Sequence, residues 1–438
     1  MARSSPLLSH HTALGAALLP YGPAESGVQL VEAFAPFGLE YAAIRTGAAL
    51  FDAPSRGLLR VIGPDRAAFL QRMVTQDMRG LEPWHSRRAF WLNRKGRIDA
   101  DVLALELPTF RHAFMQEGVV LGGIADAGST LLELDVHSAA ATAKSLGAFT
   151  IGDDVVIDDL TEQVHQFQLH GPQTLTLLAQ SATHVAGPTL EALASGQACA
   201  IEITAAANGT RCPALVVRHD LTGDPGCSII CDAANARAIY EALSHLPPVP
   251  INEGGALVAG SPPHRRLARR IGWHAINVAR LEAGTTLYNL DYGPTSLPHE
   301  TGPETLASRV SFTKGCYLGQ EVVARMQSLG HPKQRLVALD FTADGGASPQ
   351  PVTGSLVFVS ADLAQPPVGA VTSSAVSPML GGRTICLAMV KFASSAAGTP
   401  LSVLTAPGSA PVAATVRESL AFWRRGSIAA AAGGIASA

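Results

Sequence analysis

The sequence predicts an α+β protein with antiparallel sheets and a separate small β-barrel near its C-terminal end. With 438 residues, the chain is too long for one ordinary hydrophobic core, which indicates two or three domains. Before residue 330, strand-like runs alternate with amphipathic helical runs. From Arg335 onward, short strand-like runs recur at regular spacing with turn residues between them, a pattern typical of a small barrel or sandwich.

The first α+β unit begins with a strand at residues 57–62, "GLLRVI". Asp65 then stands where a helix cap is expected, before the amphipathic run of residues 66–74. Two further apolar runs flank the four-residue connection 93–96, which predicts a β-hairpin. This order of strand, helix, strand and strand predicts helices on one face of an antiparallel sheet.

The middle of the chain repeats this organisation. The expected strands are "VHQFQLH", "PALVVRHD" and "CSIICD", and the expected helices are "QTLTLLAQ" and "AANARAIYEALSHL". We therefore assign residues 11–330 to two interleaved α+β subdomains, residues 335–425 to the β-barrel and residues 426–438 to a disordered low-complexity tail.

Composition limits the kinds of function. Hydrophobic residues make up 47% and charged residues 15% of the chain, as in packed globular proteins. A net charge of -3 gives no general attraction for nucleic acid, so we expect no nucleic-acid partner. No apolar run reaches the roughly 18–20 residues that span a bilayer, so we expect no membrane partner. The first residues are Ser-rich and lack acids before Glu25, as in a transit peptide, but we favour a cytoplasmic protein and a monomer.

The six cysteines show no zinc-type spacing, so we expect no metal site. Cys227 and Cys231 are four residues apart in a strand-like run and share one sheet face. Because free cysteines are usually buried, we interpret this pair as small core residues.

The stretch "KGCYLGQE", residues 314–321, brings a lysine and a lone cysteine into one Gly-flanked turn. We expect a strand-like run at 308–312 before it and a helix from about Leu318 to Gly330 after it. A helix N-terminus and the charge of Lys314 favour a thiolate at Cys316, which makes a reactive or ligand-holding thiol one interpretation. The other is a small residue buried in a close turn, with Lys314 capping nearby carbonyl groups.

Two further charged sites stand out against apolar surroundings. Asp99 and Asp101 lie two residues apart in an otherwise apolar strand and point to the same face. Unpaired burial of two acids is costly, so either one faces a pocket or this end of the strand is solvated. Arg280 lies mid-helix among apolar residues, where its charge requires a partner, and it is a candidate ligand residue.

At "KGCYLGQE" the sequence resembles the signature of the YgfZ-type folate-binding proteins, which include iron–sulfur cluster assembly and repair factors. From about His11 to Phe392 it resembles the wider glycine-cleavage T-protein, or aminomethyltransferase, superfamily. The matching blocks are "AAIRTGAALFDAPSRGLLRVIGPDRAAFLQRMVTQD", "WLNRKGRIDAD", "RLEAGTTLYNLDYG", "GAVTSSAVSP" and "ICLAMV".

The resemblance implies a three-domain cloverleaf with tetrahydrofolate or a derivative in a central channel. It assigns Asp101 to the aspartate beside the folate and Arg280 to an arginine near the pterin. We add Tyr317 and Asn93 to the folate-binding residues. Lys314 and Cys316 fall on the distinctive residues of the signature, and we expect them to act with Asp101 in any chemistry.

The chain also departs from the T-protein pattern at four positions. Leu221 stands in place of a tyrosine and Ser228 in place of a pterin-binding glutamate. Ala100 replaces the first acid of an acid pair, and Arg88 replaces a tyrosine. These departures predict that aminomethyl transfer is absent or residual and that folate affinity is modest.

Three functions follow from the resemblance. The first is a tetrahydrofolate-binding accessory factor that assembles or repairs iron–sulfur clusters, with client enzymes or assembly proteins as partners. The second is a folate-dependent aminomethyltransferase or methyltransferase of the glycine-cleavage type. The third is a folate sensor or scaffold that catalyses no reaction.

Overall fold

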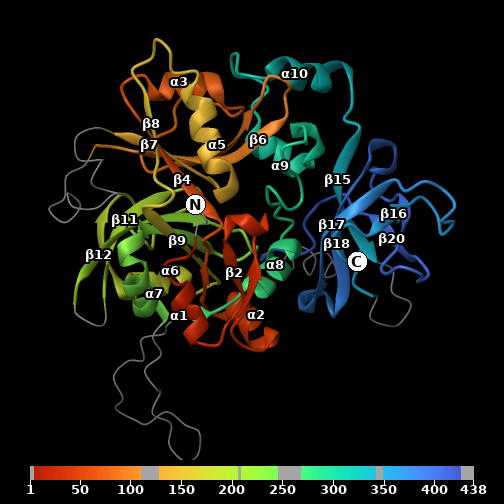
Figure 1. The fold of residues 1–438 in the computed structure, drawn as a ribbon, viewed down its shortest axis with the longest axis horizontal. Helices are drawn as coiled ribbons and strands as arrows, with labels where there is room; N and C mark the ends of the chain where they lie inside the picture. The colour runs from red at the N-terminus through yellow and green to blue at the C-terminus, as the bar shows by residue number, and fades with distance from the viewer. Residues whose placement is uncertain (1–3, 110–127, 206–208, 245–267, 342–348, 426–438) are drawn as a thin grey trace, which may run out of the picture.

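The computed structural model describes residues 4–109, 128–205, 209–244, 268–341 and 349–425. The predicted tail, residues 426–438, lies outside the described residues. Two large β-sheets, a small two-stranded sheet and a barrel organise the described residues, with the large sheets at one side and the barrel at the other (Figure 1).

The five-stranded sheet is antiparallel and has the order β5-β6-β7-β4-β8. Helices α3 and α5 cover one face, where Phe69 and Leu146 pack on the apolar residues of the strands. The prediction of helices on one face is confirmed here. The bounds are β4 Arg56–Ile62, α3 Arg66–Met73, β5 Ser86–Leu92, β6 Ile98–Leu107, β7 Ser129–Asp135, α5 Val136–Gly147 and β8 Val156–Asp159.

The seven-stranded sheet has the order β10-β11-β12-β13-β9-β3-β14. Its pairs are antiparallel except for β14, which lies parallel to β3 at the edge. Helices α6 and α7 cover its outer face, and Cys227 and Cys231 are buried beneath them as predicted. The bounds are β3 Ala49–Asp52, β9 Val164–His170, α6 Thr174–Ser181, β10 Ala182–Ala186, β11 Ala198–Thr204, β12 Arg211–His219, β13 Gly226–Asp232, α7 Ala236–Ser244 and β14 Arg269–Arg270.

The uncovered faces of the two sheets pack against each other. Leu58 and Leu103 of the five-stranded sheet share one core with Leu215 and Val217 of the seven-stranded sheet. The result is a sandwich with helices outside both sheets. Side chains of alternate residues on these strands therefore point either to a helix layer or to the space between the sheets.

The N-terminal segment is fixed to the seven-stranded sheet by a buried polar cluster. Asp52 on β3 accepts hydrogen bonds from Ser5 Oγ at 2.8 Å and lies 2.8 Å from His11 Nε2 and 2.5 Å from His165 Nε2. These side chains are nearly or fully buried. The segment comprises α1 Leu8–Ala13, β1 Ala17–Pro20, a short 3-10 turn, β2 Gln29–Ala33 and α2 Phe37–Thr46.

Three helices connect the sandwich to the barrel. Helix α8, Trp273–Glu282, packs between α2 and barrel strand β17, while α9, Pro303–Arg309, and α10, Gln320–Leu329, lie beside the hairpin β5–β6 (Figure 1). The helix predicted after "KGCYLGQE" is confirmed as α10. The predicted strand at 308–312 is wrong, because α9 continues to Arg309 and a turn follows it.

The C-terminal strands form a closed six-stranded barrel in the order β15-β18-β17-β16-β19-β20, as the strand spacing predicted. Val337, Cys386 and Val403 are among the residues that fill it. Its bounds are β15 Gln334–Phe341, β16 Leu356–Phe358, β17 Gly369–Ser377, β18 Arg383–Lys391, β19 Pro400–Val403 and β20 Val412–Val416. The division of the chain at about residue 330 remains a proposal.

Asp65 stands at the cap position of α3, but its carboxylate accepts the backbone N–H of Asp154 at 2.9 Å instead of capping the helix.

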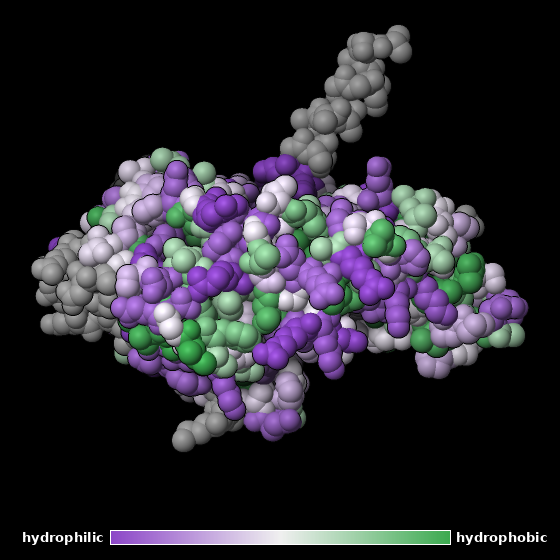
Figure 2. Space-filling view, turned by 90° about the horizontal axis from the view of Figure 1, so that it is seen from above, coloured by the Kyte–Doolittle hydropathy of each residue, from purple (hydrophilic) through white to green (hydrophobic). Residues whose placement is uncertain are grey.

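Polar and apolar residues are interspersed over the face seen in Figure 2. Within the described ranges, every helix is too short or too polar to cross a bilayer.

Candidate functional site

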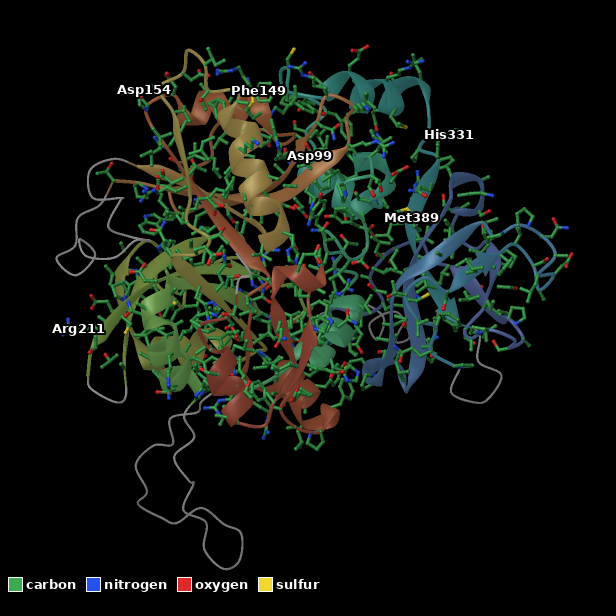
Figure 3. The ribbon with its side chains drawn as sticks, viewed as in Figure 1. Asp99, Phe149, Asp154, Arg211, His331 and Met389 are labelled. Atoms are coloured by element: carbon green, nitrogen blue, oxygen red, sulfur yellow. The ribbon has the colours of Figure 1, made fainter. Side chains whose placement is uncertain are left out.

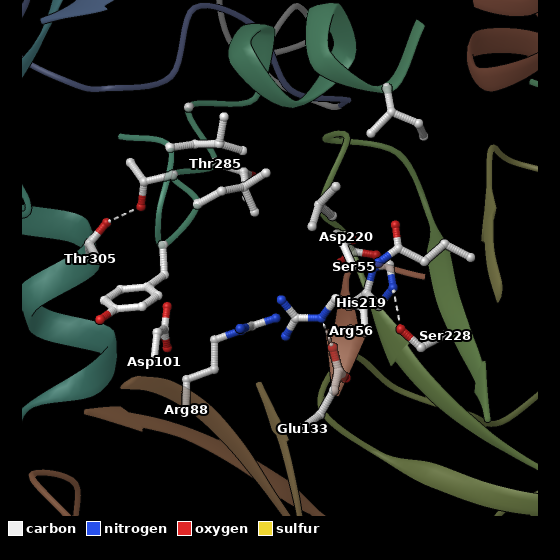
Figure 4. A pocket seen from close by; sticks show the side chains of 18 of the residues that line it. Ser55, Arg56, Arg88, Asp101, Glu133, His219, Asp220, Ser228, Thr285 and Thr305 are labelled. Atoms are coloured by element: carbon white, nitrogen blue, oxygen red, sulfur yellow. Dashed lines mark hydrogen bonds and ion pairs between the residues drawn. The ribbon is translucent and has the colours of Figure 1, made fainter. Parts of the chain in front are cut away.

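A cavity of about 420 Å³ opens where the two large sheets, helices α8 and α9 and the segment around Arg424 meet (Figure 4). Its volume is within the range of small-molecule sites. Its walls carry both aromatic rings and charged groups. The aromatic lining residues are Tyr21, Phe51, Trp273 and Tyr288, and the charged ones are Arg56, Arg88, Arg309, Arg424, Asp101, Glu133, Asp220 and Glu304. We call this cavity the central pocket.

Asp101 is the acid of the central pocket that the sequence predicted. Its side chain accepts a hydrogen bond from Tyr292 at 2.7 Å and pairs with Arg309 Nε at 3.2 Å. Burial alone would raise the pKa of Asp101, but the positive charges of Arg309 and Arg88 outweigh burial and hold the pKa below its ordinary value. Asp101 is therefore an ionised carboxylate at neutral pH.

Asp99 takes a different role from Asp101 although it lies on the same strand. Its carboxylate accepts from Asn93 Nδ2 at 2.8 Å at the start of β6. Figure 3 places Asp99 at the end of the sheet beside the segment of α9 and α10. Only one of the two acids faces the central pocket, as one of our two interpretations expected.

Glu133 and Arg56 form the second ion pair in the wall, with Arg56 Nε 2.7 Å from the Glu133 carboxylate. We did not predict Glu133, Arg56 or Arg309 as site residues from the sequence. The sequence did contain a signal for Glu133, because it is a charged residue inside the apolar strand "TLLELD", just as Asp101 is a charged residue inside its own apolar strand.

The facing sheet supplies neutral polar groups. Ser228 Oγ on β13 lies 3.3 Å from His219 Nε2 on β12, and Gln168 on β9 is the strand partner of Ser228. Burial and the positive charges of Arg88, Arg218 and Arg56 lower the pKa of His219 to about 3, so its ring is neutral at pH 7. This wall therefore presents hydroxyl, imidazole and amide groups to a ligand.

Three of the four departures from the T-protein pattern line the central pocket, namely Arg88, Leu221 and Ser228. The fourth, Ala100, is buried on the helix-facing side of β6. The residues that distinguish this chain from the pattern therefore lie mostly where a ligand would be held.

Arg280 does not line the central pocket. Its side chain has no exposed surface and donates to Asp291 at 2.5 Å, to Ser373 Oγ at 2.7 Å and to the Thr285 carbonyl at 3.1 Å. The partner that the sequence predicted for this charge is an interior carboxylate, Asp291. Asn93 does not line the central pocket either, and its side-chain oxygen accepts the N–H groups of Lys95 and Arg97 inside the hairpin.

Cys316 and Tyr317 lie at a second, separate pocket of about 460 Å³, whose other lining residues are Gln71, Arg72, Arg79 and Gly315, and Lys314 precedes these residues in the chain without lining the pocket. Lys314 Nζ donates to the carbonyl groups of Gln71, Val74 and Gln76 at 2.7, 2.6 and 2.9 Å. Burial lowers the pKa of Lys314 to about 8, while the three carbonyl acceptors match the three donors of its ammonium form. Lys314 thus anchors the motif to the end of α3, as one of our two interpretations expected.

Cys316 is exposed, which excludes the interpretation of a thiol buried in a close turn. We expected Cys316 to act with Asp101, but the two residues line different pockets, Cys316 the second pocket and Asp101 the central one. Tyr317 is nearly buried, and its ring centroid lies 5.2 Å from Lys314 Nζ. Of the predicted site residues, the central pocket therefore contains Asp101 alone.

Comparisons with known proteins agree with this architecture. Residues 7–248 match the GCVT N-terminal domain family, and residues 334–422 match the glycine cleavage T-protein C-terminal barrel domain. The aminomethyltransferase of Rubrobacter xylanophilus is 30% identical over 89% of this chain and 87% of its own length. The aminomethyltransferase of Geobacillus kaustophilus is 28% identical over 92% of this chain and 94% of its own length.

A solved structure shares the fold. The crystal structure of the glycine cleavage system aminomethyltransferase T from Bartonella henselae matches with a TM-score of 0.72 at 22% sequence identity. The match covers 97% of this chain and 99% of that chain.

Proposed function

Because this chain belongs to the glycine cleavage T-protein family, we propose that it binds a reduced folate, tetrahydrofolate or a derivative, in the central pocket. The observation that carries this proposal is the joint presence of aromatic rings and arginines in one cavity of about 420 Å³. A folate joins a flat heterocycle to an anionic tail, and rings such as Trp273 and cations such as Arg424 suit these two ends.

We further propose that the bound folate serves the transfer of an aminomethyl or methyl group. The names of the relatives favour this function over the iron–sulfur role that we placed first from the sequence. A bound tetrahydrofolate supplies the nitrogen atoms that accept a one-carbon unit. Asp101, held ionised by Arg309 and Arg88, supplies a carboxylate that can bind the ammonium group of an amine substrate or accept a proton from it.

The iron–sulfur accessory function is the second candidate, and a specific observation favours it. The stretch "KGCYLGQE" of the YgfZ-type resemblance presents an exposed thiol, Cys316, beside Arg72 and Arg79 at the second pocket. A motif that served packing alone has no need of an exposed cysteine.

One pair of assays separates the two candidates. The first measures ammonia release from an aminomethyl-lipoyl carrier with tetrahydrofolate, where turnover of about 1–1000 per second establishes the transferase. The departures Arg88, Leu221 and Ser228, which line the pocket, led us to expect low turnover from the sequence, and a rate below this range would reject aminomethyl transfer from this donor. The second measures iron–sulfur enzyme activity in a deletion strain complemented with the wild type or with Cys316→Ala. Rescue by the wild type and failure of Cys316→Ala support the accessory function, and full rescue by Cys316→Ala rejects its dependence on the thiol.

A further inference from the structure

One face of the five-stranded sheet places four charged side chains next to one another. Arg88 on β5 is the strand partner of Leu103 on β6, and Leu103 is the strand partner of Glu133 on β7. Asp101 lies two residues before Leu103, so it points to the same face. Arg56 on β4 reaches Glu133 from the neighbouring strand. These four residues form the floor of the central pocket.

The arginines beside this floor differ in how they are paired. Arg309 pairs with Asp101, and Arg56 pairs with Glu133. The third arginine, Arg88, has no hydrogen-bond or ion-pair partner for its side chain among the residues that the structure describes. Arg88 lies within the electrostatic reach of Asp101 and Glu133, but both carboxylates are engaged by other arginines, so the N–H groups of Arg88 are the ones left without a direct acceptor among these residues.

The position of Arg88 disfavours its charge. Its side chain is partly buried and extends into the pocket toward Arg56 (Figure 4). Burial and the nearby charge of Arg309 both lower the pKa of Arg88, which means that its surroundings disfavour its charge. A guanidinium carries five N–H donors, and those of Arg88 are available to a molecule in the cavity.

We infer that Arg88, beside Arg56, anchors a subsite for one carboxylate group in the central pocket. The planar fork of a guanidinium matches a carboxylate with two parallel hydrogen bonds. The neighbouring carboxylates Asp101 and Glu133 repel a phosphate dianion more strongly than a singly charged carboxylate, which favours the carboxylate as the ligand group.

The carboxylate has two possible sources, the glutamate tail of the folate or an amino-acid co-substrate that binds beside the folate. The first rests on the proposed function, but the subsite itself does not. The two sources are separated by calorimetric titration with tetrahydrofolate and with tetrahydropteroate, which lacks the glutamate. The wild type is compared with Arg88→Gln and with Arg60→Gln, which removes an arginine from the same sheet outside the pocket, where it pairs with Asp158.

If the tail is the source, the wild type and Arg60→Gln bind tetrahydrofolate at least tenfold more tightly than tetrahydropteroate, and Arg88→Gln binds both equally. If a co-substrate is the source, both folates bind all three proteins alike. Glycine then binds to the folate-loaded wild type and to folate-loaded Arg60→Gln. It binds at least tenfold more weakly to folate-loaded Arg88→Gln.

A folate-independent measurement keeps the subsite testable if no folate binds. Replacing chloride by formate at constant ionic strength should raise the melting temperature of the wild type and of Arg60→Gln more than that of Arg88→Gln. If no protein binds folate but formate still raises the melting temperature of the wild type more than that of Arg88→Gln, the proposed function is rejected and the carboxylate subsite is supported. Equal behaviour of Arg88→Gln and the wild type in every titration and in formate overturns the inference.

Discussion

At the scale of single residues, the two reactive groups that we expected from the sequence to act together, Asp101 and Cys316, lie in different pockets. Asp101 supplies an ionised carboxylate in the central pocket. Cys316 supplies an exposed thiol at the second pocket. Any reaction that needs both groups at one carbon atom is therefore excluded by their positions, and each group requires its own test.

Cys316 should be the first of the six cysteines to be alkylated near pH 7. All six lie in the described residues, and the other five are buried. Burial also raises the pKa of Cys199 to about 12 and raises that of Cys227 and Cys386, which keeps these thiols protonated. Mass-spectrometric mapping after a short iodoacetamide pulse measures the order. Labelling of any buried cysteine before Cys316 would contradict the assignment.

Asp52 should make folding sensitive to acid. Although its burial opposes ionisation, His165 and His11 hold the pKa of Asp52 below its ordinary value. A carboxyl with a lowered folded pKa stabilises the fold above its unfolded value of about 3.9, and this contribution is lost as the pH falls further. Asp52→Asn should therefore lower the free energy of unfolding by about 3 kcal/mol at pH 7, because it breaks a buried pair.

Asp52→Asn should lower the free energy of unfolding by less in acid than at pH 7. At pH 3 the difference between Asp52→Asn and the wild type should shrink, since part of the wild-type advantage is lost there. Urea denaturation at both pH values measures the effect. An equal difference at pH 7 and pH 3 would show that Asp52 acts through packing and not through its charge.

The place of Asp101 in a pocket wall could be predicted from the sequence, because an acid in an apolar strand needs polar surroundings. The same reasoning was insufficient for Arg280, since a buried arginine can be satisfied by an interior carboxylate as well as by a ligand, and its partner Asp291 supplies that carboxylate. Arg309 was not predictable in this way, because its neighbour Asp101 is distant in the chain and only the fold joins them.

At the scale of elements, the hairpin β5–β6 and the start of α10 interlock through two glycines. Gly96 has a φ of +71°, and a Cβ there would lie 2.7 Å from Val322 Cβ. Gly319 has a φ of +80°, and a Cβ there would lie 2.7 Å from the Asn93 carbonyl oxygen. The hairpin β5–β6 and the "KGCYLGQE" motif with the start of α10 therefore pack directly against each other.

Gly319→Ala should destabilise the protein by about 1–3 kcal/mol, because alanine is strained at positive φ and its methyl group meets backbone. Gly315→Ala is the matched control in the same motif, since a Cβ there meets no atom within 4 Å. Equilibrium denaturation of both variants tests the contact. A Gly315→Ala variant as unstable as Gly319→Ala would contradict this account.

Elements were predictable where alternation or amphipathic spacing was strong, as in β4, β9 and α7. The failure at residues 308–312 has a local cause. Pro303 starts a short helix, α9, whose seven residues are too few to show a helical period. The pairing of the strands was not predictable, because neighbours such as β13 and β9 are distant in the chain.

At the scale of the whole molecule, a buried ion pair joins the barrel to the wall of the central pocket. Arg280 on α8 contacts Asp291, and both contact Ser373 on barrel strand β17. Asp291 also accepts the N–H of Leu287, a residue that lines the pocket. The barrel therefore supports the pocket from outside.

Arg280→Met should lower the free energy of unfolding by about 3 kcal/mol, because it leaves Asp291 buried without its guanidinium partner. Arg325→Met on the exposed surface of α10 is the control and should change it by less than about 0.5 kcal/mol. Urea denaturation measures both. If Arg280→Met is as stable as Arg325→Met, the ion pair does not hold the barrel in place.

Folate binding in the central pocket is the central claim, and anaerobic calorimetry with tetrahydrofolate tests it most directly. We predict a micromolar dissociation constant, about -8 kcal/mol. Trp273→Ala, which removes an aromatic ring from the pocket, should weaken binding at least tenfold, while Arg60→Gln outside the pocket should not. No heat and no competition by tetrahydrofolate up to millimolar concentration would contradict the claim, as would equal affinity of Trp273→Ala and the wild type.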